Sequence, residues 1–112
     1  TILDNLDAQT HPNGKPAWIN PKARFIHGDC RNRADWEKAL SDGVEYVFHQ
    51  AAFGGFTPQL SMYMDSNAAG TALMFEVIRD GALPVKKIVV ASSQAVYGES
   101  GYANSKGAVS YP

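Results

Sequence analysis

Apolar residues occur in short runs along this 112-residue chain, separated by residues that form turns. The runs predict β-strands over residues 1–4, 24–29, 44–52 and 86–93. The run at residues 44–52 is apolar for most of its length, which is typical of a strand buried on both faces. Residues 8–22 are polar and contain three prolines, so they predict a long loop.

Two segments have apolar side chains at helical spacing, residues 32–40 and residues 58–80. The apolar positions of the second segment are Leu60, Met64, Ala68, Ala72, Phe75 and Ile78. The first segment has two candidate caps, Asn32 and Asp35, and Gly81 stands at the expected C′ position of the second. Strands that alternate with helices favour an α/β fold with a parallel sheet and right-handed crossovers.

Composition narrows the class of protein. Hydrophobic residues make up 45% of the chain and charged residues 19%, which predicts one ordered domain over residues 1–112. A net charge of −1 gives no basic surface for a nucleic acid, and no apolar run is long enough to span a membrane. The single cysteine, Cys30, cannot form an internal disulfide and suits a reducing compartment, so we expect a cytoplasmic protein.

Small and polar residues gather where the predicted strands end. Asp4, Asp29, Ala51-Ala52 and Ser92-Ser93 follow or close the four strands in turn. Ligands of open α/β sheets bind beyond the carboxyl ends of the strands. We therefore expect a nucleotide there, with the carboxylates reading one edge and the small residues admitting a flat ring. His27 and His49 lie in strand patterns without the carboxylate or cysteine spacing of a metal site, so no metal is expected.

Five segments in register carry a resemblance to a known family. They are Ile2-Leu3-Asp4-Asn5-Leu6, Phe25-Ile26-His27-Gly28-Asp29, Val47-Phe48-His49-Gln50-Ala51-Ala52, Asn67-Ala68-Ala69-Gly70-Thr71 and Ser92-Ser93-Gln94-Ala95-Val96-Tyr97-Gly98. In these segments the chain resembles the extended short-chain dehydrogenase/reductase superfamily, in particular the NAD-dependent nucleotide-sugar epimerases and dehydratases. The resemblance implies a Rossmann-like, doubly wound parallel sheet.

The resemblance also implies how the residues would contact NAD. Asp4, with Asn5 beside it, would accept hydrogen bonds from the adenosine ribose hydroxyls, and an acid there disfavours the 2′-phosphate of NADP. Asp29 would contact the adenine amino group, with the Cys30 backbone beside the ring. Ala51 and Ala52 would flank the nicotinamide ribose. Asn67, at a helical position, would bond across to neighbouring strands and is interpreted as structural.

The same resemblance assigns catalytic roles toward a nucleotide-sugar substrate. Ser93 would bond the substrate oxygen at which hydride transfer occurs, and Gln94-Ala95 stand where dehydratases place an Asp-Glu pair. Epimerisation is therefore favoured over dehydration. Tyr102 and Lys106 spell the family's Tyr-x-x-x-Lys motif, which on one helix face would make the tyrosine a general base. They follow Ser93 closely and are bracketed by Gly101 and Gly107, so the alternative is a catalytic pair beyond Pro112.

One family element does not occur in these residues. No G-x-x-G-x-x-G phosphate loop is present, and neither is the first strand that it follows. We therefore expect an internal fragment, inactive in isolation, with a gap between two pairs of strands whose inner edges are unpaired. The alternatives are a nucleotide-sugar dehydratase, a non-catalytic NAD-binding protein of the same fold, and an α/β nucleotide binder with flavodoxin-like winding. Relatives often pair through helices beside the site, so residues 58–80 are a candidate homodimer surface.

Overall fold

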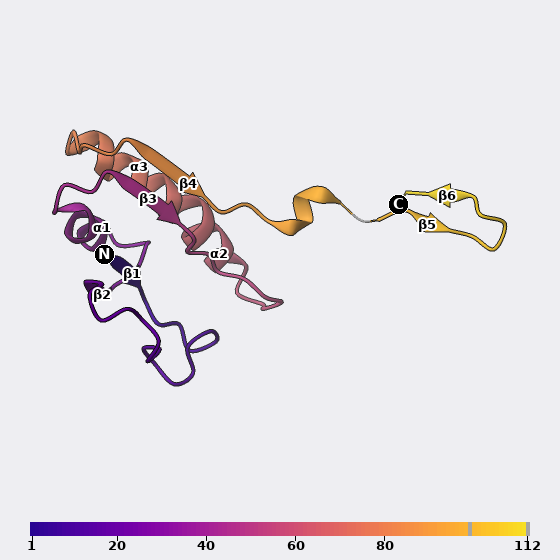
Figure 1. Cartoon of the computed structure of the whole chain (residues 1–112), viewed down its shortest axis with the longest axis horizontal. Helices are drawn as coiled ribbons and strands as arrows, with labels where there is room; N and C mark the ends of the chain where they lie inside the picture. Colours follow the sequence, from indigo (N-terminus) through magenta and orange to yellow (C-terminus); the bar gives the residue numbers. More distant parts are fainter. Residues whose placement is uncertain (99, 112) are drawn as a thin grey trace.

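Two pairs of parallel strands organise the chain, which we describe from a computed structural model over residues 1–98 and 100–111 (Figure 1). Strand β1 (Ile2–Asp4) pairs with β2 (Phe25–His27), and β3 (Tyr46–His49) pairs with β4 (Lys87–Val90). The pairs are separate two-stranded sheets. This arrangement confirms the parallel α/β prediction, including the gap expected between the pairs.

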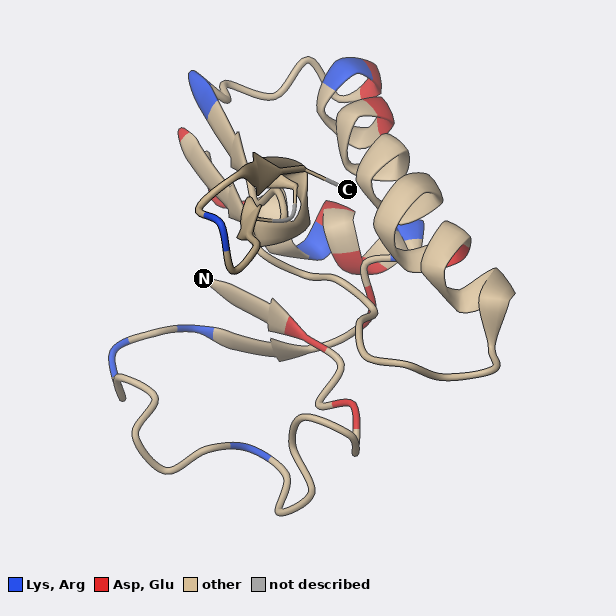
Figure 2. Ribbon diagram, turned by 90° about the vertical axis from the view of Figure 1, so that its right-hand side faces the viewer, with Lys and Arg blue, Asp and Glu red and all other residues tan. Residues whose placement is uncertain are grey.

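The helices lie side by side along the strands, as Figure 2 shows. Helix α1 (Arg33–Leu40) begins after Asn32, whose side chain accepts a hydrogen bond from the Ala34 N–H. The longer helix has three parts, α2 (Leu60–Tyr63), a π-helical turn η1 (Met64–Ala69) and α3 (Gly70–Asp80). Sequence periodicity predicted both helices but gave no sign of the wider π-helical turn, which is a local change in hydrogen bonding.

The end of the longer helix corrects one detail of the prediction. Gly81 is the C-cap and keeps a right-handed conformation, with φ of −84°, whereas Ala82 has a φ of 45°. The left-handed residue is thus one position later than expected. A Cβ on Gly81 would lie 3.1 Å from the Leu83 side chain, so close packing also favours glycine at this position.

The core lies between the helices and the strand pairs. Its buried residues are Trp36, Leu40, Val47, Met74 and Val77. In β3 only Val47 and His49 are buried, while Tyr46 and Phe48 are 56% and 69% exposed. The prediction that this strand is buried on both faces is therefore wrong for this chain, because the core covers only one of its faces.

The longer helix packs through a stripe that its apolar periodicity did not identify. Its buried residues are Ser66, Gly70, Met74 and Val77. Five of the six periodic positions are exposed instead, and we call them the outer stripe: Leu60, Met64, Ala68, Ala72 and Phe75. Leu60 is 75% exposed and Met64 is 65% exposed, so the outer stripe presents apolar surface away from the core.

The C-terminal segment extends away from the strands and helices in Figure 1. It contains a 3₁₀ turn, η2 (Gln94–Tyr97), and an antiparallel hairpin of β5 (Tyr102–Ala103) and β6 (Val109–Ser110). Within residues 1–98 and 100–111, no helix is long and apolar enough to cross a membrane.

Candidate nucleotide-binding site

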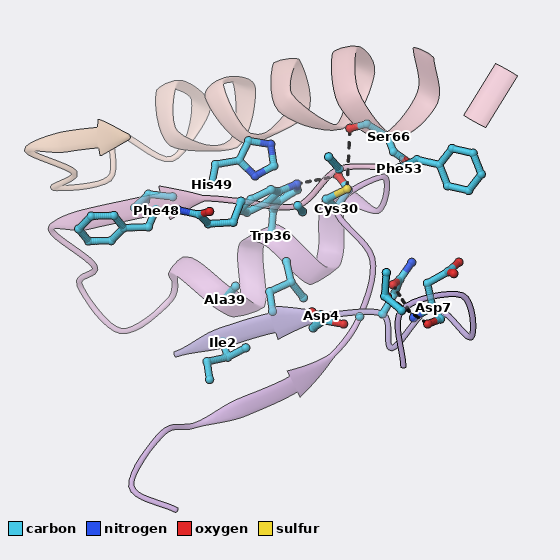
Figure 3. Close-up of a pocket in the computed structure, with 18 of the residues that line it drawn as sticks. Ile2, Asp4, Asp7, Cys30, Trp36, Ala39, Phe48, His49, Phe53 and Ser66 are labelled. Atoms are coloured by element: carbon cyan, nitrogen blue, oxygen red, sulfur yellow. Dashed lines mark hydrogen bonds between the residues drawn. The ribbon is translucent and has the colours of Figure 1, made fainter. Parts of the chain in front are cut away.

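A cavity of about 780 Å³ lies between the two strand pairs and extends to their carboxyl ends. It is lined by five of the six residues predicted to contact the cofactor: Asp4, Asn5, Cys30, Ala51 and Ala52. Figure 3 shows Asp4 at the end of β1, below Trp36 and His49 on the opposite wall. Much of the cavity is the gap between the strand pairs, and the candidate site is only its end at the carboxyl ends of the strands, where these five residues lie.

Asp4 is fixed by a tight turn that follows β1. Its Oδ1 accepts a hydrogen bond from the Leu6 N–H at 2.7 Å, and Leu6 has a φ of 52°. The Nε2 atom of His11, from the long β1–β2 loop, lies 3.7 Å from the same oxygen. The Asp4 side chain remains 39% exposed, so its carboxylate can accept further hydrogen bonds from a ligand.

Asp29 lies beside this cavity and is held in a small polar network. Asn5 Nδ2 donates to Asp29 Oδ2 at 3.1 Å, and Arg31 donates to both carboxylate oxygens, at 2.9 and 2.7 Å. The Arg31 hydrogen bonds hold the pKa of Asp29 well below its usual range, against the opposing effect of partial burial. The Arg31 backbone N–H also donates to Asp29 Oδ1, at 2.9 Å, so each oxygen of this ionised acceptor already receives two hydrogen bonds.

The wall of the cavity is formed by Cys30, Trp36 and His49. Trp36 Nε1 donates to the Cys30 carbonyl at 2.7 Å, which fixes the backbone at this point. Burial raises the pKa of the Cys30 thiol, so this cysteine is a poor nucleophile. His49 packs edge-on against Trp36 at 5.5 Å, and its Nε2 lies 2.8 Å from Thr71 Oγ1. Burial lowers the pKa of His49, which favours the neutral form of this core histidine.

Asn67 connects the π-helical turn to the loop after β3. Its Oδ1 accepts from the Phe53 N–H at 2.7 Å, and its Nδ2 donates to the Phe53 carbonyl at 3.0 Å. This amide clamp gives Asn67 a structural role, but its partner is the loop after β3 and not a neighbouring strand as expected. Ala51 and Ala52 precede Phe53 directly, so the clamp also determines where these two cavity residues lie.

The three catalytic candidates lie outside the set of residues that line the cavity. Ser93 caps η2, and its Oγ accepts from the Ala95 N–H at 3.1 Å while keeping its own proton to donate. Tyr102 lies on β5 and Lys106 in the turn before β6. They are not on one helix face, because Asn104 Oδ1 accepts from the Lys106 N–H at 2.9 Å and Gly107, with φ of 78°, closes the turn.

Sequence reasoning missed several residues of the site. Arg31 was not predicted to pair with Asp29, although the spacing of two residues was a usable local signal. His11 and Gln9 both line the cavity from the long loop, and Gln9 Nε2 donates to the Gly54 carbonyl at 3.3 Å. No sequence signal identifies them, since these contacts depend on how the loop folds back.

Comparisons with known proteins agree with this geometry. The model of the NAD dependent epimerase/dehydratase family matches residues 3–110. The chain belongs to this family. Among its relatives, it is 32% identical to a dTDP-L-rhamnose 4-epimerase of Burkholderia thailandensis and 39% identical to a putative UDP-glucose 4-epimerase of Methanocaldococcus jannaschii. These alignments cover 99% and 90% of the chain.

Solved structures of this family share the fold. A UDP-glucose 4-epimerase matches 97% of the chain with a TM-score of 0.71 at 24% identity, which shows the fold alone. A UDP-glucuronic acid 4-epimerase from Bacillus cereus, solved in complex with NAD, matches 87% with a TM-score of 0.60 at 27% identity. The chain spans 32% of the length of each of the two curated relatives and 33% and 28% of these two structures.

Proposed function

We propose that the protein carrying this chain is an NAD-dependent nucleotide-sugar epimerase, and that residues 1–112 supply the adenosine side of its NAD site. The meeting of polar and small residues at the carboxyl ends of the two strand pairs is the observation that carries the proposal. It brings Asp4 and Asn5 from the first pair together with Ala51 and Ala52 from the second. These residues are distant in sequence, and their convergence at one edge of the strands supports the proposal.

The residues of the cavity fit the dinucleotide. Asp4 is a half-exposed carboxylate that can accept from the two ribose hydroxyls, and its charge opposes a 2′-phosphate. Asp29, kept ionised by Arg31, would accept from the adenine amino group by exchanging one of its present donors, such as Asn5 Nδ2, with the fixed Cys30 backbone beside the ring. Ala51 and Ala52 add little bulk where the nicotinamide ribose would lie.

NAD, held by these residues, would supply the hydride acceptor for reversible oxidation at a sugar carbon. Ser93 would donate its hydroxyl proton in a hydrogen bond to the substrate oxygen, since Oγ is already held as an acceptor by Ala95. A general base is also required, and it is either Tyr102 assisted by Lys106 or an equivalent pair elsewhere in the natural protein. Gln94 and Ala95 carry no proton-transfer group, which supports epimerisation over dehydration.

A second candidate is a non-catalytic NAD-binding protein of the same fold. One observation favours it, namely that Tyr102 and Lys106 lie on a hairpin rather than along a helix. The i, i+4 helical spacing by which a lysine ammonium would promote ionisation of the phenol is therefore not the arrangement of this segment. The two candidates share the NAD site and differ only in whether a nucleotide-sugar is turned over.

The deciding experiment uses the natural protein, measured first for intact mass and NAD binding. It is then incubated with UDP-glucose and with dTDP-L-rhamnose carrying deuterium at the carbon to be oxidised, and the products are followed by NMR. Interconversion of epimers with the deuterium retained is the expected result. Loss of water would indicate a dehydratase, and NAD binding without turnover would indicate the non-catalytic protein. No NAD binding would overturn the proposal for this chain.

The proposal also includes association into a homodimer and a cytoplasmic location, where Cys30 stays reduced. The outer stripe, Leu60, Met64, Ala68, Ala72 and Phe75, supports the dimer, because alanines at its centre allow two helices to approach closely. Met64→Asp should convert the natural protein to a monomer in light scattering. Ser61→Asp, an exposed position beside the stripe, is the matched control and should stay dimeric.

A further inference from the structure

The loop between β3 and α2 leaves the sheet beside the end of β4. The two strands run parallel, and the Ala91 N–H donates to the His49 carbonyl at 3.0 Å where their pairing ends. Ala51-Ala52, where the nicotinamide ribose would lie, and Ser93, which would bond the substrate oxygen, therefore follow neighbouring strand ends. Residues 53–57 continue directly from this point, so we expect them to lie next to the sugar of a bound substrate.

Tyr63 of α2 holds this part of the loop from two sides. Its hydroxyl donates to the Gly55 carbonyl and accepts from the Thr57 N–H, the latter at 3.3 Å. Its ring packs edge-on against the Phe53 ring, with the centroids 5.0 Å apart. The residue between the two hydrogen-bonded positions is Phe56, so a single tyrosine fixes the backbone on either side of it.

The Phe56 side chain is fully exposed and lies one residue beyond the cavity lining, to which Phe53, Gly54 and Gly55 belong. An exposed phenylalanine is by itself ordinary on a protein surface. Phe56 differs because its backbone is held at both neighbours, and a rigid loop loses little conformational entropy when a ligand packs against it. The loop therefore presents a fixed aromatic ring beside the candidate site.

We propose that Phe56 contacts the sugar ring of the nucleotide-sugar substrate and that Tyr63 is the residue that positions it. This inference rests on the proposed function. A sugar ring has an apolar face of C–H groups that can pack on a flat aromatic ring, while its hydroxyls form hydrogen bonds with polar groups. Phe56 does not line the cavity that would take NAD, so its loss should affect the sugar and not the cofactor.

The test uses the natural protein with UDP-glucose and dTDP-L-rhamnose. Phe56→Ala should raise KM about tenfold for the sugar that is turned over, the size expected when part of a phenylalanine ring is no longer buried. The value of kcat should stay unchanged, because the contact is the same in the ground state and the transition state. In calorimetry this variant should bind the nucleotide-sugar about tenfold more weakly, yet bind UDP or dTDP alone as the natural protein does.

Two further variants control for the loss of the ring. Phe56→Tyr keeps a flat aromatic side chain and should restore both KM and the affinity for the nucleotide-sugar. Trp18→Ala is the matched control, because it removes an exposed aromatic ring from the β1–β2 loop, outside the cavity lining. It should change neither quantity.

Tyr63→Phe tests the positioning role, since it keeps the ring against Phe53 and removes only the hydroxyl. We expect KM to rise about threefold with kcat unchanged, because the substrate must then order the loop as it binds. In the Phe56→Ala background the same substitution should have no further effect on KM, since no ring remains to be positioned. An equal effect of Tyr63→Phe in both backgrounds would overturn the positioning role.

The outcomes separate this inference from the function on which it rests. Failure of the natural protein to bind NAD, or to bind either nucleotide-sugar, would overturn the proposed function and this inference with it. Normal binding of both, with KM and nucleotide-sugar affinity unchanged in Phe56→Ala, would overturn the sugar contact alone. A lower melting temperature alongside that unchanged affinity would show that another part of the natural protein covers the ring, which also overturns the contact.

Discussion

The amide clamp between Asn67 and Phe53 gives a sharp test of how the cavity is held. Asn67→Ala removes two hydrogen bonds, of 2.7 and 3.0 Å, to the Phe53 N–H and carbonyl. Each hydrogen bond contributes about 1 kcal/mol to the free energy of unfolding. The loss does not exceed this value, because water can bind the Phe53 N–H and carbonyl once the amide is removed. Alanine recovers about 0.6 kcal/mol through its higher helix propensity. The net loss should be about 1.5 kcal/mol.

The assay is urea unfolding of the natural protein, followed by the fluorescence of the buried Trp36. NAD affinity is measured on the same samples and should fall about threefold, because Ala51 and Ala52 are no longer held in place by the clamp. Ser61→Ala is the control, since it replaces an exposed polar residue of the same helix with alanine. If Asn67→Ala changes stability and NAD affinity no more than Ser61→Ala does, the clamp does not position the cavity and the reasoning is wrong.

Three further substitutions test other parts of the site. Asp4→Asn should weaken NAD binding about tenfold in calorimetry through loss of charge-assisted hydrogen bonds, and should narrow the preference for NAD over NADP; an unchanged preference would contradict the assignment. Arg31→Ala should lower the free energy of unfolding by at most about 1 kcal/mol at pH 7. The folded-state pKa of Asp29 lies below its ordinary value of 3.8, so the contribution of Arg31 is fully present above pH 3.8 and is lost as pH falls through the depressed pKa. The free energies of unfolding of the natural protein and of Arg31→Ala should therefore converge in acid titrations. Gly70→Ala should lower the free energy of unfolding by about 1 kcal/mol despite a better helix propensity, because its Cβ would lie 3.1 Å from Cys30 Sγ and 3.2 Å from the Cys30 carbonyl. A higher free energy of unfolding in urea would show that the segment around Cys30 moves to accommodate the Cβ.

Local patterns were sufficient for four strands and both helices, and for half of the site, but not for the π-helical turn, the 3₁₀ turn or the β5–β6 hairpin. Four apolar runs predicted β1 to β4, and helical spacing predicted both helices, because each pattern reflects side-chain geometry within one element. Asp4, Asn5, Ala51 and Ala52 were identified because residues at strand ends meet at one edge of a parallel sheet. The parallel pairing followed from the order of strands and helices, whereas the gap followed from the family resemblance, which places a further strand between the two pairs.

Contacts between elements were harder to predict from the sequence than the elements themselves. Asp35 was a candidate helix cap, but its Oδ2 accepts from the Asp29 N–H at 2.9 Å, and Asn32 caps the helix instead. Both residues have side chains suited to capping, so the sequence alone does not choose between them. His11 reaches Asp4 only because the loop between β1 and β2 folds back, and nothing in its local sequence encodes that direction.

The amino-acid sequence by itself determined the elements, their parallel pairing and the chemistry available at the strand ends. These properties depend on the period of apolar residues and on which side chains follow each strand. The tertiary structure alone decided which stripe of the long helix is buried. Ser66, Gly70, Met74 and Val77 face the core because small residues let the helix approach Cys30 and the α1 helix, while the more apolar outer stripe remains exposed. Close packing, rather than hydrophobicity alone, therefore set the orientation of the helix and the wall of the cavity.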